Sequence, residues 1–190
     1  MRTFEVGNST VTVVFGDITT STCEILVSSD DYGISMGGGV SRAIGNAGGS
    51  AVWADAGKSV PAKLGEVVVS TAGNLPARYI LHAITIGAQN DRIPADVVVR
   101  SATRRALELL PLLRCSSIAF PAIGSGAARL PLEVVASEMA ATIFESLLAD
   151  SGSYRVELYL MAREGRVTHD ELVDFIETFT ARRFARHEVQ

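Results

Sequence analysis

The sequence lacks the features that mark several large classes of protein. It has only two cysteines and three histidines. Cys23 and Cys115 lie far apart, so neither a disulfide framework nor a clustered metal site is expected. Its 17 basic residues do not outnumber its 21 acidic ones, and the net charge of −4 argues against a protein that coats DNA. No apolar run approaches the roughly 20 residues that span a bilayer. We therefore expect a cytoplasmic protein with reduced thiols, no metal, no cofactor, no DNA partner and no membrane contact.

Apolar residues make up 47% of the chain, and they fall in segments that alternate between strand and helix patterns. Strand patterns cover residues 4–15, as a hairpin around Gly7-Asn8, and then 24–29, 65–73, 77–85, 116–122 and 154–161. Helix patterns run from the glycines near residue 39 to about 56, over 95–113 and 131–147, and from about 168 onward. We therefore predict one α/β domain over residues 1–190, with helices on both faces of a sheet and the C-terminal helix packing on that sheet.

Two glycine-rich loops, Gly37–Gly39 and Gly124–Gly126, each follow a predicted strand and precede a predicted helix. In α/β sheets ligands bind beyond the carboxyl ends of the strands. A glycine loop that opens a helix also presents free N–H groups to an anion. The dinucleotide fingerprint is incomplete in both loops, because Arg42 and Arg129 stand where its third glycine belongs. The pattern indicates two anion-binding loops beside one cleft; for either loop alone, a tight turn without a ligand is the alternative.

Motifs along nearly the whole chain resemble those of the macro domain, a module that binds ADP-ribose. This resemblance implies a three-layer α/β/α fold with a central mixed sheet. It also implies that ADP-ribose or an ADP-ribosylated protein is the partner. The motifs that carry it are Phe15–Thr19, the strand ILVSSDD, Gly37–Val40 with Ala43-Ile44, Gly65–Val68, Tyr79–His82 and Ser117–Ile123 with the loop that follows.

By this resemblance, the two loops hold the diphosphate between their backbone N–H groups, which a Cβ would keep at a distance. Asp17 corresponds to the acidic residue that accepts a hydrogen bond from the adenine amino group; a cap aspartate before Thr19 is the alternative. Met161 corresponds to a position that often carries an aromatic side chain over adenine, and an ordinary core methionine is the alternative. The ligand-binding residues implied are Asp17, Ile18, Asp31, Gly37, Gly38, Gly39, Val40, Gly124, Ser125, Gly126, Ala127, Ala128 and Met161.

The chain departs from the family pattern around the distal ribose. Asp31 stands where many members carry an asparagine, and as a carboxylate it is suited to accept from ribose hydroxyls or to act as a base toward water. It is our candidate catalytic residue; a strand-end aspartate held by local N–H groups is the alternative. Ser41 replaces the aspartate of a hydrolytic branch. Ala127 and Ala128 stand where an aromatic residue commonly covers the ribose.

Three functions follow from these patterns. The first is a binding module for free or protein-attached ADP-ribose. The second is a mono-ADP-ribosyl hydrolase that releases ADP-ribose from modified protein or acts on an ADP-ribosyl ester, with Asp31 directing water. The third is a scaffold that contacts protein or RNA, against which the net negative charge counts. His82, within an apolar strand, is expected to be a core histidine rather than a catalyst.

Overall fold

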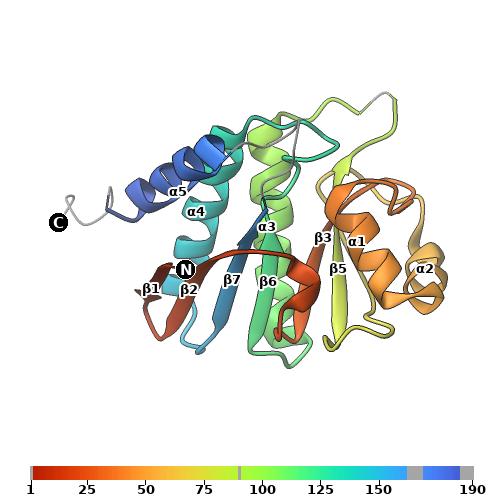
Figure 1. Cartoon of the computed structure of the whole chain (residues 1–190), viewed down its shortest axis with the longest axis horizontal. Coiled ribbons are helices and arrows are strands. Elements are labelled where there is room, and N and C mark those ends of the chain that lie inside the picture. The colour runs from red at the N-terminus through yellow and green to blue at the C-terminus, as the bar shows by residue number, and fades with distance from the viewer. Residues whose placement is uncertain (1, 90, 162–168, 185–190) are drawn as a thin grey trace.

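The computed structural model of the chain describes residues 2–89, 91–161 and 169–184. Over these residues the backbone forms a seven-stranded mixed sheet in the order β1-β2-β7-β6-β3-β5-β4 (Figure 1). The central pairs β2–β7, β7–β6, β6–β3 and β3–β5 are parallel, whereas β1 and β4 pair antiparallel at the two edges. The strands are β1 (Arg2–Val6), β2 (Ser9–Phe15), β3 (Ile25–Asp31), β4 (Val67–Thr71), β5 (Tyr79–Ile86), β6 (Ser117–Pro121) and β7 (Arg155–Leu160).

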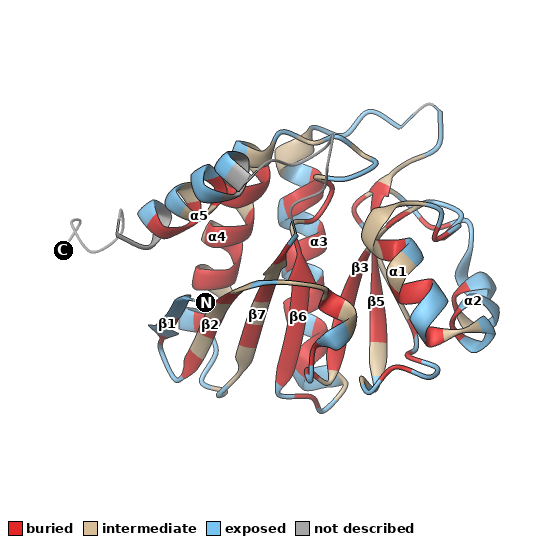
Figure 2. Ribbon diagram, viewed as in Figure 1, coloured by how far each residue is buried: buried red, intermediate tan, exposed pale blue. Residues whose placement is uncertain are grey.

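Helices cover both faces of the sheet, as predicted. They are α1 (Gly39–Gly48), α2 (Ser50–Ala56), α3 (Ala95–Leu112), α4 (Leu132–Ala149) and α5 (His169–Phe184), with short 3₁₀ turns η1 (Ile18–Thr20) and η2 (Gly57–Ser59). Side chains alternate along β3, so that Ile25 and Val27 join the core under α3 and α4 while Leu26 joins the core under α1 and α2. Figure 2 shows β3, β5 and β6 buried along most of their length. No helix in the part of the chain that the structure describes is long and apolar enough to cross a bilayer.

The three-layer α/β/α prediction is therefore confirmed, and the hairpin around Gly7-Asn8 is the β1–β2 pair. One helix boundary was predicted wrongly. The expected single helix ending near residue 56 is two helices, because Gly49 between them has φ +79°. That left-handed conformation interrupts the helical ladder and favours glycine.

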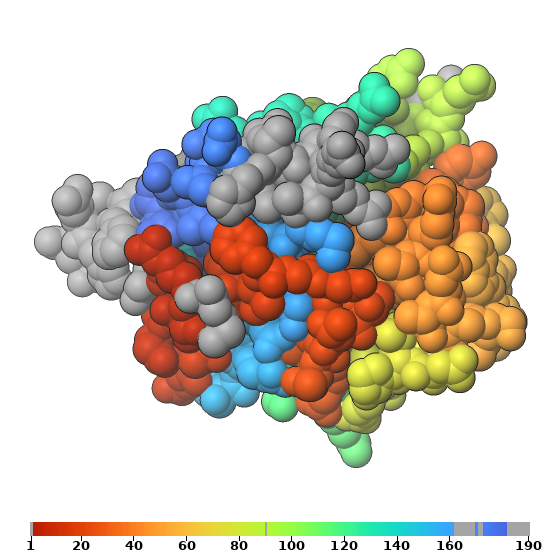
Figure 3. All heavy atoms as spheres, viewed as in Figure 1, coloured from red at the N-terminus to blue at the C-terminus, as the bar shows by residue number. Residues whose placement is uncertain are grey.

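The C-terminal helix, expected to pack on the sheet, lies against α4 at the far side of the molecule from α2 (Figure 1). Phe179 on α5 contacts Phe144 on α4 with ring centroids 5.4 Å apart. Phe175 and Phe179 are both buried in the core cluster that α4 shares with β2 and β7. The segment after β2 runs over β6 and places η1 against α1, on the face seen in Figure 3.

Candidate ligand-binding cleft

A cavity of about 700 Å³ opens at the carboxyl ends of the parallel strands. The last residues of β5, β6 and β7 line it (Ile86, Pro121 and Leu160), together with Asp31 at the end of β3 and Gly16 just after β2. In α/β sheets this edge is where ligands bind. The cavity therefore lies where the strand–loop–helix pattern predicted a cleft.

The two glycine loops meet across this cavity. A Cβ built on Gly38 would lie 3.2 Å from the Cβ of Ala127. Gly38 is the N-cap of α1, and it presents no side chain there. The first N–H groups of a helix have no intrahelical partner, so α1 begins with free donors beside the opposite loop.

Most of the predicted ligand residues line the cavity. Gly124 and Ala128 are the two that do not. Gly124 is buried at φ +78°, and a Cβ there would lie 2.5 Å from Leu130 Cδ1. The predicted residues that line the cavity are Asp17, Ile18, Asp31, Gly37, Gly38, Gly39, Val40, Ser125, Gly126, Ala127 and Met161.

Gly124 serves to attach the second loop to the sheet. Its N–H donates to Ser29 Oγ at 3.1 Å, and that hydroxyl lies 2.9 Å from Thr85 Oγ1 on β5. The loop is therefore held over the end of β3 by hydrogen bonds rather than by apolar packing alone, which leaves Ser125, Gly126 and Ala127 facing the cavity.

Asp17 performs the capping role that was its alternative assignment, and it also lines the cavity. Its Oδ1 accepts a hydrogen bond of 2.9 Å from the Thr19 N–H at the start of η1. A carboxylate has further lone pairs for a ligand donor. Ile18 is buried beside it. Met161 is not a core residue, because 42% of it is exposed and it lines the same end of the cavity.

Asp31 is held by its own loop, as its alternative assignment proposed, while also lining the cavity. Its Oδ1 accepts from the N–H groups of Gly33 at 2.8 Å and Ser35 at 3.3 Å. The Ser35 hydroxyl donates a hydrogen bond to Oδ2. Three local donors thus orient the carboxylate, and Ser35 lines the cavity together with Asp31.

Several lining residues were not among the predicted ligand residues, and they include Arg42, Tyr159 and Ser35. Arg42 is the one basic side chain among the described lining residues, and its Nε donates to Gly37 O at 3.1 Å. Tyr159 was detectable, because strand alternation places it on the same side as Met161. Burial raises the pKa of the Tyr159 hydroxyl, so it stays protonated at neutral pH.

Asp30, which also lines the cavity, forms a buried chain of hydrogen bonds with His82 and Ser70 across β3, β5 and β4. His82 Nδ1 lies 2.9 Å from Asp30 Oδ2, and His82 Nε2 lies 2.8 Å from Ser70 Oγ. Ser28 Oγ donates to the same Asp30 oxygen at 2.6 Å. The side chains of His82 and Asp30 are fully buried. His82 is thus a core residue with satisfied ring nitrogens, as expected.

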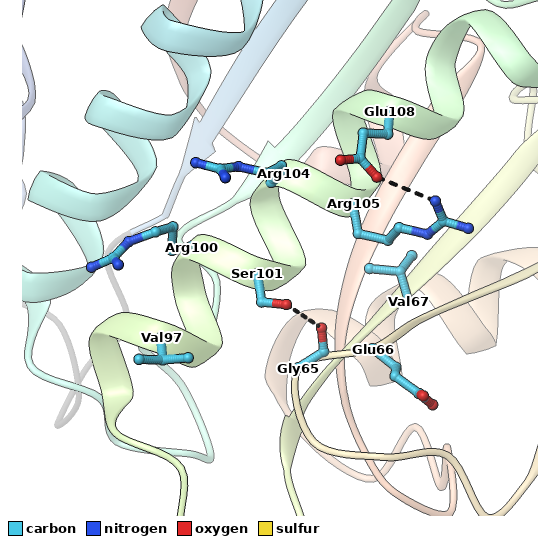
Figure 4. A pocket seen from close by; sticks show the side chains of 9 residues that line it. All are labelled: Gly65, Glu66, Val67, Val97, Arg100, Ser101, Arg104, Arg105 and Glu108. Carbon is cyan, nitrogen blue, oxygen red and sulfur yellow. Dashed lines mark hydrogen bonds and ion pairs between the residues drawn. The ribbon is translucent and has the colours of Figure 1, made fainter.

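A second cavity of about 550 Å³ lies between α3 and the start of β4 (Figure 4). Its arginines are matched by acidic side chains: Arg100 with Asp96 and Glu138, Arg104 with Glu145, and Arg105 with Glu108. In Figure 4, Arg100 and Arg104 point away from Gly65. These charges are already neutralised within the protein, so we place the functional site at the first cavity. Among the described residues, no group of three or more His, Cys, Asp and Glu is arranged to hold a metal.

Comparison with known proteins matches this architecture. The family model described as Macro domain matches residues 27–139. An uncharacterized protein of Aeropyrum pernix is 36% identical over 145 residues, which cover 75% of this chain and 76% of that protein. The "O-acetyl-ADP-ribose deacetylase 1" of Pantoea vagans is 30% identical over 131 residues, covering 67% of this chain and 77% of that protein.

The fold is also similar to solved structures. A mutant of the Oceanobacillus iheyensis macrodomain superposes with a TM-score of 0.79 at 26% identity, covering 95% of this chain and 96% of that one. Another mutant of that macrodomain, solved with ADPR, has a TM-score of 0.76 at 25% identity, with 95% and 97% covered.

Proposed function

This chain belongs to the macro domain family, and on that basis we propose that its cleft binds ADP-ribose, free or attached to a protein. The observation that carries the proposal is the approach of the two glycine loops, where a Cβ on Gly38 would lie 3.2 Å from Ala127 Cβ. A diphosphate between the loops receives N–H donors from both sides. A related macrodomain was solved with ADPR.

The first loop suits the diphosphate for two physical reasons. The N-terminus of α1, a helix of 10 residues, carries partial positive charge that favours an anion. Arg42 holds the Gly37 carbonyl by hydrogen bonding. This contact fixes the loop and brings a positive charge near the phosphates, offsetting the acidic residues that also line the cleft.

The adenine is assigned to the end of the cleft formed by η1 and the end of β7. There the free lone pairs of Asp17 accept from the adenine amino group, and Ile18 supplies the neighbouring backbone. Met161 and Tyr159 cover the ring; a thioether and an aromatic ring are both suited to a flat π surface.

Calorimetry with ADP-ribose tests the binding proposal. Asp17→Ala is expected to weaken the affinity at least tenfold, about 1.4 kcal/mol, because both the adenine acceptor and the η1 cap are lost. Asp17→Asn keeps an oxygen for the Thr19 N–H and is expected to bind with intermediate affinity. Glu108→Ala removes an exposed carboxylate on α3 and serves as the matched control, with unchanged affinity. No heat from the wild-type protein at high micromolar ADP-ribose contradicts the proposal.

The alternative function is hydrolysis of an ADP-ribosyl linkage or ester. Asp31 favours it, because an oriented carboxylate lines the cleft beyond the diphosphate loop. The Pantoea vagans relative named as a deacetylase adds an ester to the substrates worth testing. Release of label from an ADP-ribosylated protein or from O-acetyl-ADP-ribose should be lost in Asp31→Ala while ADP-ribose binding persists. Equal turnover in that variant would refute the role of Asp31.

A further inference from the structure

We propose that Ser35 is a catalytic nucleophile for ester substrates in this cleft, with Asp31 as its base. The inference rests on the ester branch of the proposed function and names a residue and a covalent step for it.

Ser35 and Asp31 already form the contact that such a pair requires. The Ser35 hydroxyl donates a hydrogen bond to Asp31 Oδ2. The other carboxylate oxygen is held by the N–H groups of Gly33 and Ser35 at 2.8 and 3.3 Å. A nucleophilic hydroxyl hydrogen-bonded to a base that is itself oriented by further donors is the arrangement expected of an activated serine.

The conformation and burial of the residues on either side of Ser35 keep the Ser35 side chain exposed. Ile34 and Met36, on either side, have φ of +47° and +48°, a left-handed conformation that is rare for any residue with a side chain and especially for a β-branched one. Both neighbours are buried, with 4% and 1% exposed, whereas Ser35 is exposed and lines the cavity. Two anchored neighbours in a strained conformation hold the serine outward, and such strain is concentrated at functional sites.

Ser35 also lies between the two parts of the cleft that an ester of ADP-ribose would contact. On one side its hydroxyl reaches Asp31. On the other, a Cβ on Gly37 would lie 3.2 Å from Ser35 Oγ, so the missing side chain at Gly37 leaves the hydroxyl uncovered beside the diphosphate loop. A diphosphate fixed by that loop brings an acyl group on the adjoining ribose to Ser35, which replaces a bimolecular encounter with a positioned one.

The reaction balances with water as the only co-reactant. Ser35 Oγ forms a bond to the acyl carbon while its proton passes to Asp31, and the bond between that carbon and the ribose oxygen breaks. The ribose hydroxyl leaves with the proton from Asp31, and an acyl-serine remains. Water then attacks the acyl carbon and gives its proton to Asp31. The carboxylic acid leaves, and Ser35 regains the proton. A carboxylate is a modest base, which suits esters rather than the less reactive amides.

The decisive experiment compares turnover with binding in the same variants. With O-acetyl-ADP-ribose, we expect Ser35→Ala to lower kcat by about 100-fold or more, with the Kd for ADP-ribose within about threefold of wild type. Ser35→Cys is expected to retain acyl transfer through a thioester that hydroxylamine releases. Ser59→Ala, an exposed serine on η2 outside the cleft, is the control and should leave both quantities unchanged.

Mass spectrometry after p-nitrophenyl acetate treatment gives a second readout that does not need the diphosphate site. An acetyl group on the peptide containing Ser35, absent from Ser35→Ala, supports the proposal even if ADP-ribose does not bind and the proposed function fails. Unchanged turnover in Ser35→Ala, with ADP-ribose still bound, overturns the nucleophile and leaves the binding function intact. A wild-type protein that neither turns over the ester nor becomes acetylated also overturns it.

Discussion

Replacing Gly38 by alanine tests the approach of the two loops with the smallest possible change. Gly38 has φ −113° and ψ 157°, which alanine adopts without strain. The new Cβ would lie 3.2 Å from the Cβ of Ala127, closer than the roughly 3.5–4.0 Å at which two carbons are best separated. The second loop must therefore move by a few tenths of an ångström. This shift changes the separation of the two loops whose N–H groups we expect to hold the diphosphate.

The expected losses in stability and in affinity differ in size. Alanine is a poorer N-cap than glycine by about 1 kcal/mol, which for a chain of this length lowers Tm by about 2–4 °C. Phosphate oxygens must come to about 2.9 Å from the amide nitrogens of both loops, and displacement of the second loop prevents both sets of contacts from forming together. We therefore expect the Kd for ADP-ribose to rise at least tenfold, about 1.4 kcal/mol, in isothermal titration calorimetry.

Gly57→Ala is the matched control for this substitution. Gly57 is exposed at φ −59° on η2, and a Cβ there would meet nothing within 4 Å. Affinity should be unchanged, and stability should be equal or higher by about 0.4–1 kcal/mol, because alanine restricts the unfolded chain. The reasoning is refuted if Gly38→Ala binds ADP-ribose as tightly as wild type, or if both variants lose affinity equally.

Two further substitutions test buried side chains in the core. His82→Leu removes the histidine partner of Asp30 Oδ2 and of Ser70 Oγ and should lower the free energy of unfolding by about 1–3 kcal/mol in urea titrations; a loss below about 0.5 kcal/mol would show that these hydrogen bonds carry little stability. Burial raises the pKa of the Cys23 thiol from 9.0 to about 11, so above pH 9 the unfolded chain releases this proton first and stability falls as the pH rises. The stability difference between wild type and Cys23→Ala should shrink by about 1.4 kcal/mol from pH 8 to pH 10, and a constant difference would count against this burial.

The order of strands and helices was predictable because hydrophobic periodicity and glycine loops are local signals. The fully apolar segment Ser117–Pro121 is the central parallel strand β6, buried at every position, and both glycine loops lie at the carboxyl ends of strands, as predicted. The break at Gly49 was missed although Gly48-Gly49 is visible in the sequence. Because helical patterns continue on both sides of Gly48-Gly49, the sequence predicted one continuous helix there.

The polar contacts of the site were less predictable, because they depend on strands distant in sequence. The Asp30–His82 contact joins β3 to β5 across 52 positions, and no local pattern encodes that register. The alternatives at Asp17 and Asp31 proved to be real contacts: each side chain is held by local N–H groups while also lining the cavity. Sequence reasoning treated the two roles as exclusive, but a carboxylate with several lone pairs can fill both.

A crystal structure of the protein with ADP-ribose tests the central claim most directly. We predict electron density for the diphosphate between Gly37–Val40 and Ser125–Ala127, with the adenine beside Asp17 and the distal ribose toward Asp31. Density for the nucleotide at any other surface, or a diphosphate that contacts only one of the two loops, would contradict it.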